Sequence, residues 1–134
     1  MASIRLSRYV TLKELGRGGM ATVYLARSLQ ENQLYALKVL PRQFTHDPMF
    51  RDRFARESKT VAGLHHESII PVYDFGEEDG TPYLVMRYMP GGTLADRMAR
   101  GRISRAEAAR VLAPIAAALD YAHQRGVIHR DIKP

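Results

Sequence analysis

A glycine-rich stretch, Leu15-Gly16-Arg17-Gly18-Gly19-Met20-Ala21-Thr22-Val23, lies between two runs of residues that are typical of β-strands. The flanking runs, residues 9–15 and 22–27, contain β-branched and aromatic residues, so the stretch predicts a hairpin. Glycines in such a turn can be purely structural, or they can let backbone N–H groups approach an anion closely. A dinucleotide-binding fold would need a helix after the glycines, and a P-loop would need G-x-x-x-x-G-K-[ST]; the sequence has neither. The stretch therefore favours an antiparallel sheet.

The residues after the hairpin continue the strand pattern around one helix. A third strand-like run ends at Pro41, and Asp47-Pro48 is a typical helix start with proline at the first helical position. Apolar residues then recur at helical spacing as far as Gly63. We expect further strands at residues 34–40, 69–75 and 82–86, which makes five in all.

The second part of the chain is helical. The segment 90–92, Pro-Gly-Gly, interrupts the strand pattern, and Thr93 is positioned to cap a short helix. Ser104 and Glu107 match the S-x-x-E capping box, and they open a long, alanine-rich helix. Residues 127–134 predict a short strand followed by a turn.

Composition excludes several classes of protein. The chain carries 20 Lys and Arg against 14 Asp and Glu, but these residues are scattered, and no aromatic residues are interleaved as a stacking platform. We therefore expect no nucleic-acid partner. The absence of cysteine excludes disulfides and Cys-based metal sites. No apolar run approaches the roughly 20 residues that span a bilayer, so we expect this portion to be cytoplasmic, with no membrane segment.

Three further features could carry chemistry, although each also has an ordinary structural explanation. Lys38 follows Ala36 and Leu37 in an apolar strand, where a lysine is costly unless its ammonium finds an anion or reaches solvent. Glu57, on the following helix, could pair with Lys38 or could simply be solvated. Near the C-terminal end, Asp131 and Lys133 lie two residues apart, so they could serve a hydroxyl and a phosphate together.

The order of these features along the chain resembles the pattern of a known family. The glycine-rich stretch comes first, followed by the strand lysine, the helix glutamate and finally His129-Arg130-Asp131-Ile132-Lys133-Pro134. They are similar to the N-terminal half of the catalytic domain of eukaryotic-like protein kinases, in the bacterial serine/threonine branch, over residues 9–134. The resemblance implies an α+β fold. It predicts an N-lobe at residues 1–86, with a five-stranded antiparallel sheet and the αC helix, a hinge at 87–92, and a partial helical C-lobe at 93–134.

The resemblance also implies roles for individual residues. Lys38 would hold the α- and β-phosphates of ATP, with Glu57 as its partner. Asp131 would orient the substrate hydroxyl and accept its proton, while Lys133 would neutralise the γ-phosphate. The implied ATP-binding residues are Leu15, Gly16, Arg17, Gly18, Gly19, Met20, Ala21, Thr22, Val23, Ala36, Lys38, Met86, Tyr88 and Met89.

Three positions depart from the family pattern. Ala21 stands where the third glycine is expected, so we expect slightly altered loop mobility with binding retained. Arg87 stands in the hinge where many relatives carry an acidic residue. Thr93 stands where some relatives place a glutamate on the ribose, which puts that contact in doubt.

The function implied is transfer of the γ-phosphoryl group of ATP to serine or threonine hydroxyls of proteins. The Mg²⁺ ligands of the family are the asparagine of H-R-D-x-x-x-x-N and the aspartate of D-F-G, and both would lie beyond Pro134. We therefore expect the 134 residues to be an inactive part of a longer kinase that is interrupted within the H-R-D loop. The full-length kinase could carry a membrane anchor downstream of this part. The alternative is a catalytically dead module that binds nucleotide or a partner. The sequence does not predict an oligomeric state.

Overall fold

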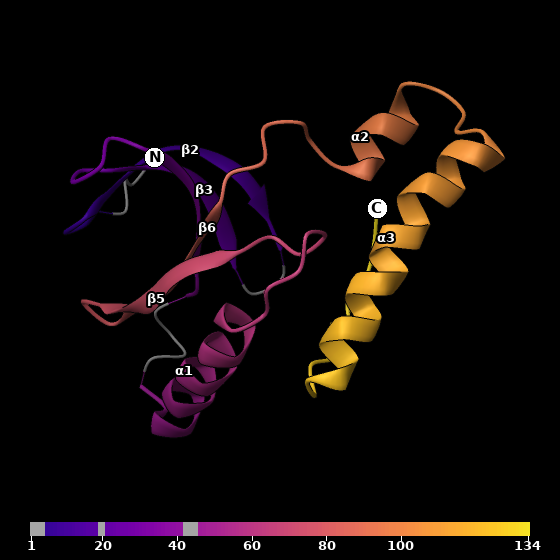
Figure 1. Cartoon of the computed structure of the whole chain (residues 1–134). Helices are drawn as coiled ribbons and strands as arrows, with labels where there is room; N and C mark the ends of the chain where they lie inside the picture. The colour runs from indigo at the N-terminus through magenta and orange to yellow at the C-terminus, as the bar shows by residue number, and fades with distance from the viewer. Residues whose placement is uncertain (1–4, 19–20, 42–45) are drawn as a thin grey trace. The chain divides into compact units, whose positions relative to one another are not determined.

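The computed structural model describes residues 5–18, 21–41 and 46–134 (Figure 1). The chain forms two compact units. The first comprises the chain up to Gly63 together with Pro71–Tyr88, and the second comprises Leu64–Ile70 together with Met89–Pro134. The segment Leu64–Ile70 thus belongs with the C-terminal helices, although in sequence it lies between two elements of the first unit.

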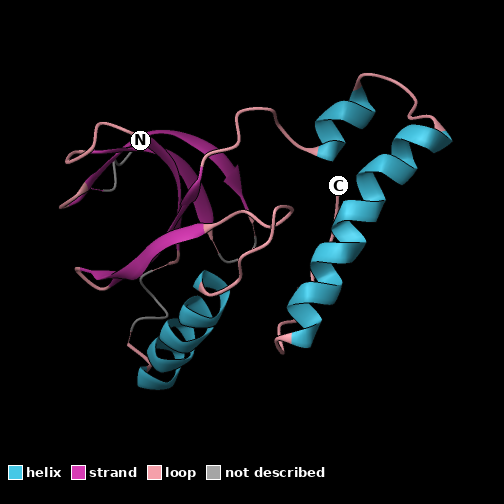
Figure 2. Ribbon diagram, in the orientation of Figure 1, coloured by secondary structure: helices cyan, strands magenta, loops and turns pink. Residues whose placement is uncertain are grey.

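The first unit is built on an antiparallel sheet, which Figure 2 shows in magenta. Within the described residues the sheet has six strands in the order β1-β2-β3-β4-β6-β5. The strands are β1 (Arg5–Leu6), β2 (Tyr9–Arg17), β3 (Thr22–Ser28), β4 (Leu34–Val39), β5 (Val72–Glu78) and β6 (Thr81–Arg87). The five predicted strands are confirmed, and β1 adds a two-residue strand at one edge.

Two details of the strands differ from the sequence-based expectation. β5 begins at Val72 rather than at residue 69, because Pro71 precedes it and its carbonyl instead accepts a hydrogen bond from the amide of Arg87 (N···O 3.2 Å). The β5–β6 hairpin turns at Asp79 (φ 50°) and Gly80 (φ 73°). Two successive positive φ values are the signature of the tight turn whose twist matches that of antiparallel strands.

The sheet has two chemically different faces. Its hydrophobic core includes Leu37, Val85 and Ala26, whose side chains have no exposed surface, together with Val39 and Tyr83. Successive residues of a strand point to opposite faces, so the neighbours of Leu37 in β4, Ala36 and Lys38, point to the other face. The core therefore leaves one face of β4 available for a site.

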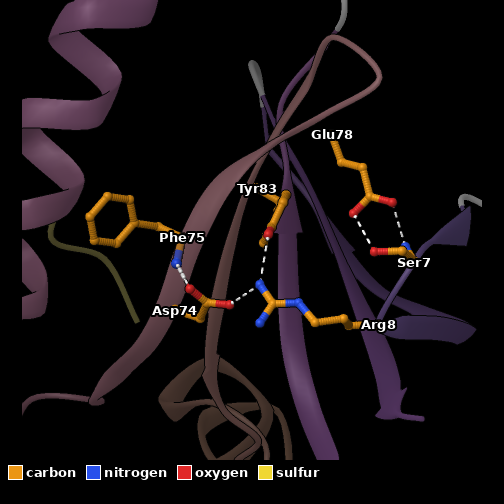
Figure 3. A network of polar contacts seen from close by, with 6 residues as sticks. All are labelled: Ser7, Arg8, Asp74, Phe75, Glu78 and Tyr83. Carbon is orange, nitrogen blue, oxygen red and sulfur yellow. Dashed lines mark hydrogen bonds and ion pairs between the residues drawn. The ribbon is translucent and has the colours of Figure 1, made fainter. Parts of the chain in front are cut away.

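Side chains join the two ends of the strand order (Figure 3). Arg8, in the turn between β1 and β2, lies with its guanidinium 2.8 Å from the carboxylate of Asp74 in β5, and it also donates to the hydroxyl of Tyr83. Beside this pair, the amide and hydroxyl of Ser7 donate to the carboxylate of Glu78. Since β1 and β5 are the outermost strands, these bonds hold the sheet in a strongly curled form.

One helix completes the first unit. α1 (Pro48–Ala62) lies against β5 and β6. As predicted, it begins after Asp47, whose carboxylate accepts from the amide of Met49 (3.0 Å), and it ends at Gly63. Arg51 pairs with Glu77 of β5 at 2.8 Å, which fixes the first turns of the helix to the sheet edge.

The second unit contains α2 (Leu94–Ala99) and α3 (Arg105–Gln124). Thr93 caps α2, as predicted. Ser104 caps α3 by accepting from the amide of Glu107 (3.1 Å). The Glu107 carboxylate does not complete the predicted capping box, because it pairs with Arg97 of α2 instead (2.8 Å).

The strand expected within residues 127–134 was a wrong prediction. In this described stretch the backbone is irregular, and the amide of Val127 donates to the carbonyl of Ala122 at the end of α3 (2.9 Å).

The segment Leu64–Ile70 is held to α3 by Tyr121, whose hydroxyl accepts from the amide of His65 (2.9 Å). Across the described parts of the chain, no helix has both the length and the apolar character that a bilayer crossing requires.

Candidate active site

The predicted site residues fall into two groups, one in each unit. In the first unit, β2 and β3 are joined by the glycine-rich turn, and the amide of Gly18 donates to the carbonyl of Ala21 (2.9 Å). Gly16 lies opposite Val23 and Arg17 opposite Thr22, after a bulge in β2 between Glu14 and Gly16. Gly19 and Met20 lie outside the described residues.

Nothing in the described part of the chain requires glycine at Gly16 or Gly18. A Cβ added at Gly16 would meet no atom within 4 Å, and one added at Gly18 would lie 3.9 Å from the carbonyl oxygen of Ala21. Neither residue has a φ in the left-handed region. Open space at two glycines of one turn is what a ligand that closely approaches the backbone would need.

Arg17 is engaged within its own strand. Its guanidinium forms two hydrogen bonds of 3.1 Å with the carboxylate of Glu14, and the side-chain hydrogen bond lowers the pKa of Glu14 below its ordinary value. Leu15, between them, is partly exposed. In this arrangement the charge of the Arg17 guanidinium is paired with the Glu14 carboxylate.

The face of the sheet opposite the core collects four predicted residues. Lys38 lies opposite Val23 of β3, while Ala36, two residues before it, lies opposite Met86 of β6. Directly opposed residues of antiparallel strands share a face, as do residues two apart in one strand. Val23, Ala36, Lys38 and Met86 therefore form a continuous surface with one cation and three apolar side chains.

Lys38 is half-buried in the middle of this surface, and Ala36 is buried. Glu57 lies on α1 with its side chain exposed, whereas the next residue, Ser58, is buried. Among the described residues no ion pair joins the Lys38 ammonium to the Glu57 carboxylate. The pairing implied by the family resemblance is not formed in this arrangement of α1, and the role of Glu57 stays a prediction.

Arg87, the first residue of the predicted hinge, is held by contacts with β5 and with the residue before that strand. Its Nε donates to the hydroxyl of Tyr73 (3.1 Å), and its amide donates to Pro71, so both side chain and backbone are fixed at the end of β6. Tyr73 was not predicted as a partner of Arg87, because its position depends on a register shift between Val72 and Asp74 that no sequence pattern indicates. Tyr88 ends the first unit, and Met89 belongs to the second.

Of the predicted catalytic residues, Lys38 and Glu57 lie in the first unit, and Asp131 and Lys133 lie in the second. Lys133 Nζ lies 3.3 Å from the Asp131 carboxylate, and both side chains are about 70% exposed (69% and 74%). The amide of Asp131 donates to Nδ1 of His129 (3.2 Å), and Arg130 between them has φ 67°. In this turn the carboxylate of Asp131 and the ammonium of Lys133 lie side by side and are open to solvent.

Thr93, a position in doubt for ribose binding, has a local structural role. Its hydroxyl accepts from the amide of Asp96 (3.1 Å), and the Asp96 carboxylate accepts from the amide of Thr93 (2.8 Å). This reciprocal pair is a complete capping box at the start of α2. The backbone hydrogen bond from Thr93 lowers the pKa of Asp96.

A sequence profile of the protein kinase domain matches residues 9–134. The chain belongs to the protein kinase family. The Serine/threonine-protein kinase PknJ of Mycobacterium tuberculosis is 46% identical over 120 residues, which cover 90% of this chain and 20% of that protein. PrkC of Bacillus subtilis is 41% identical over 128 residues, covering 95% of this chain and 20% of that protein.

Solved structures agree with the family assignment. A crystal structure of the Mycobacterium tuberculosis PknI kinase domain superposes with a TM-score of 0.83 at 37% identity, covering 100% of this chain and 55% of that one. The predicted bacterial serine/threonine kinase family and α+β fold are thereby confirmed. The chain spans about a fifth of the length of the curated kinases named here. Protein kinases in general use ATP and Mg²⁺ and act on protein substrates.

Proposed function

We propose that this chain supplies the nucleotide-binding face and the catalytic aspartate of a kinase that phosphorylates serine and threonine residues of proteins. One observation carries the proposal. Lys38 lies on a surface with Val23, Ala36 and Met86, next to a turn whose glycines leave open space. That combination of one cation and apolar contacts suits a purine nucleotide, which has an apolar base and anionic phosphates.

The described residues fit ATP in chemical terms. Val23, Ala36 and Met86 offer apolar contacts for the adenine ring, and the open space at Gly16 and Gly18 would let phosphate oxygens approach the backbone of the turn. Lys38 is a compact point charge, suited to the α- and β-phosphates. Backbone groups of Tyr88 and Met89 would recognise the adenine edge. ATP supplies the transferable γ-phosphoryl group, and the protein residues position it.

The roles proposed for the second unit follow from the chemistry of Asp131 and Lys133. The substrate oxygen forms a bond to the γ-phosphorus while the bond from that phosphorus to the β,γ-bridging oxygen breaks. The proton released by the hydroxyl passes to the Asp131 carboxylate. Lys133, which already lies beside that carboxylate, would neutralise charge on the transferring group.

Among the described residues, no three Asp, Glu or His side chains converge in a way that could hold a metal ion. The roles proposed here for Lys38, Asp131 and Lys133 are phosphate binding, proton acceptance and charge neutralisation.

The test is transfer of γ-labelled phosphate from ATP to a generic serine- and threonine-containing protein, using the native gene product. Lys38→Met and Asp131→Asn should each reduce the rate by about a thousandfold or more, the scale seen when an essential catalytic group is removed. Lys59→Met, an exposed lysine of α1, is the matched control and should leave the rate nearly unchanged. ATP binding without any transfer would support the alternative, a nucleotide-binding module. Equal effects of Lys38→Met and Lys59→Met would contradict the proposal.

A further inference from the structure

Arginine is concentrated in residues 97–110, which comprise the end of α2, the loop after it and the first turns of α3, and which we call the connector. Residues 97–110 contain five arginines and one acidic residue, Glu107. Arg97 forms an ion pair with Glu107. The others are Arg100, Arg102, Arg105 and Arg110, and all four are exposed. In the described part of the chain, the side chains of Arg102, Arg105 and Arg110 take part in no ion pair or hydrogen bond.

The connector that carries these arginines has a fixed geometry. The Arg97 guanidinium donates two hydrogen bonds to the carboxylate of Glu107 (2.9 and 2.8 Å) and one to the carbonyl of Gly101 (3.4 Å). The amide of Gly101 donates to Met98 (3.2 Å), and Gly101 has φ 143°, a backbone conformation that favours glycine. Binding of a partner here would therefore cost little conformational entropy, because the connector is already ordered.

An open pocket lies in the same connector. It has a volume of about 510 Å³ and is lined by Met98, Ala99, Gly101, Arg102 and Ile103. Met98 is half exposed in it, at 50% of its surface. An apolar hollow with an arginine on its rim can accept an apolar side chain while the guanidinium binds an anion beside it.

We propose that this connector docks an acidic segment of a partner protein. Carboxylates of the segment would pair with Arg102 and Arg105, and one apolar side chain would enter the pocket beside Met98. Arginine suits this role because its planar fork matches a carboxylate with two parallel hydrogen bonds. The unbalanced positive charge of residues 97–110 supplies the complementarity.

Other anionic partners fit the same observations less well. Residues 97–110 contain no aromatic side chain on which a nucleic-acid base could stack. α2 is six residues long, which is short for a helix that lies in a membrane surface. The proposal goes beyond phosphoryl transfer and needs neither ATP nor catalysis, so it can fail while the kinase function stands.

The test measures binding of a fluorescein-labelled peptide, with six glutamates around a central leucine, to the whole chain by fluorescence anisotropy. Arg102→Glu/Arg105→Glu should weaken binding about tenfold or more, since two favourable charge pairs become repulsive. Met98→Ser should weaken it severalfold. The matched control is Arg27→Glu/Arg53→Glu, which changes the net charge equally at two exposed arginines of the first unit and should change binding less than about twofold. Circular dichroism of each variant confirms that the helices are retained.

The outcomes separate the alternatives. Loss of binding in the connector variants alone, and for a peptide whose leucine is replaced by serine, supports the docking surface. Equal weakening by both double variants, or no measurable binding of the peptide, overturns it. If phosphatidylglycerol vesicles bind through Arg102 and Arg105 while the peptide does not, the partner is a lipid surface and the proposal is wrong.

Discussion

The amide of Gly18 donates a hydrogen bond to the carbonyl of Ala21 across the β2–β3 turn, at an N···O distance of 2.9 Å. Because the acceptor is a backbone carbonyl, alanine serves as well as glycine at position 21. This explains how the turn closes although the third glycine of the family pattern is absent. At Gly16 and Gly18 a Cβ would meet little or nothing among the described residues, so these are the glycines of the turn at which a ligand would gain room.

Gly18→Ala should separate folding from binding. A Cβ at this position makes only an ordinary contact with Ala21, so the free energy of unfolding in urea should change by less than about 1 kcal/mol. The same methyl group would stand where phosphates approach the turn, and ATP affinity should fall about tenfold. Fluorescence of an N-methylanthraniloyl-ATP measures the affinity. A large loss of stability with unchanged affinity would mean that the glycine is structural.

Gly92→Ala is expected to behave in the opposite way. Gly92 has φ 85°, and a Cβ there would lie 2.7 Å from the Asp96 oxygen that accepts from Thr93. The substitution should therefore disturb the start of α2 and destabilise that helix by about 1–2 kcal/mol. Amide hydrogen exchange in residues 94–99 measures the effect. Unchanged protection of these amides would contradict the described turn.

The same cap predicts a pH dependence. The pKa of Asp96 is lowered in the folded chain, chiefly by the hydrogen bond from the amide of Thr93. The carboxylate therefore stabilises the start of α2 above the unfolded pKa of about 3.9, and this stabilisation is lost as pH falls through the lower folded value. The Thr93 amide shift should report this titration by NMR, and Asp96→Asn should abolish it. A midpoint at or above pH 4 would be inconsistent with the bond.

Local signals in the sequence were sufficient to predict the helix starts. Asp47, Thr93 and Ser104 each act on amides two or three residues away, so a short pattern contains the whole interaction. The strands of the sheet could also be predicted from local signals, namely short runs of β-branched and aromatic residues. The strand predicted at 127–134 was wrong because Val127 and Ile128 have strand-forming side chains but, within the described residues, no strand lies alongside them for pairing.

Contacts between distant residues could not be predicted in this way. Arg8 and Asp74 are 66 residues apart, and their contact depends on how far the sheet curls. The Lys38–Glu57 distance depends on where α1 lies against the sheet, which no short pattern encodes. The support of Arg87 by Tyr73 likewise depends on an irregularity in β5. The shared face of Val23, Ala36, Lys38 and Met86, in contrast, followed once the strand register was known.

The Arg8–Asp74 pair should contribute measurably to the stability of the first unit. The two side chains are 47% and 31% exposed, so the pair is only partly screened by solvent. A double-mutant cycle with Arg8→Met and Asp74→Ala should give a coupling of about 0.5–1 kcal/mol in urea unfolding. The Arg17–Glu14 pair, whose arginine is more exposed (69%) and whose partners lie in the same strand, serves as the comparison with Arg17→Met and Glu14→Ala and should couple less. Equal couplings would mean that the pair does not hold the sheet closed.

The central claim is that the face of β4 bearing Lys38 binds the phosphates of ATP. Isothermal titration of the chain with ATP and with adenosine tests it most directly, because the two ligands differ only in their phosphates. Lys38→Met should weaken ATP binding by about tenfold or more while leaving adenosine binding nearly unchanged, and Lys59→Met should affect neither. If Lys38→Met leaves the preference for ATP over adenosine intact, Lys38 does not bind phosphate and the account of this face is wrong.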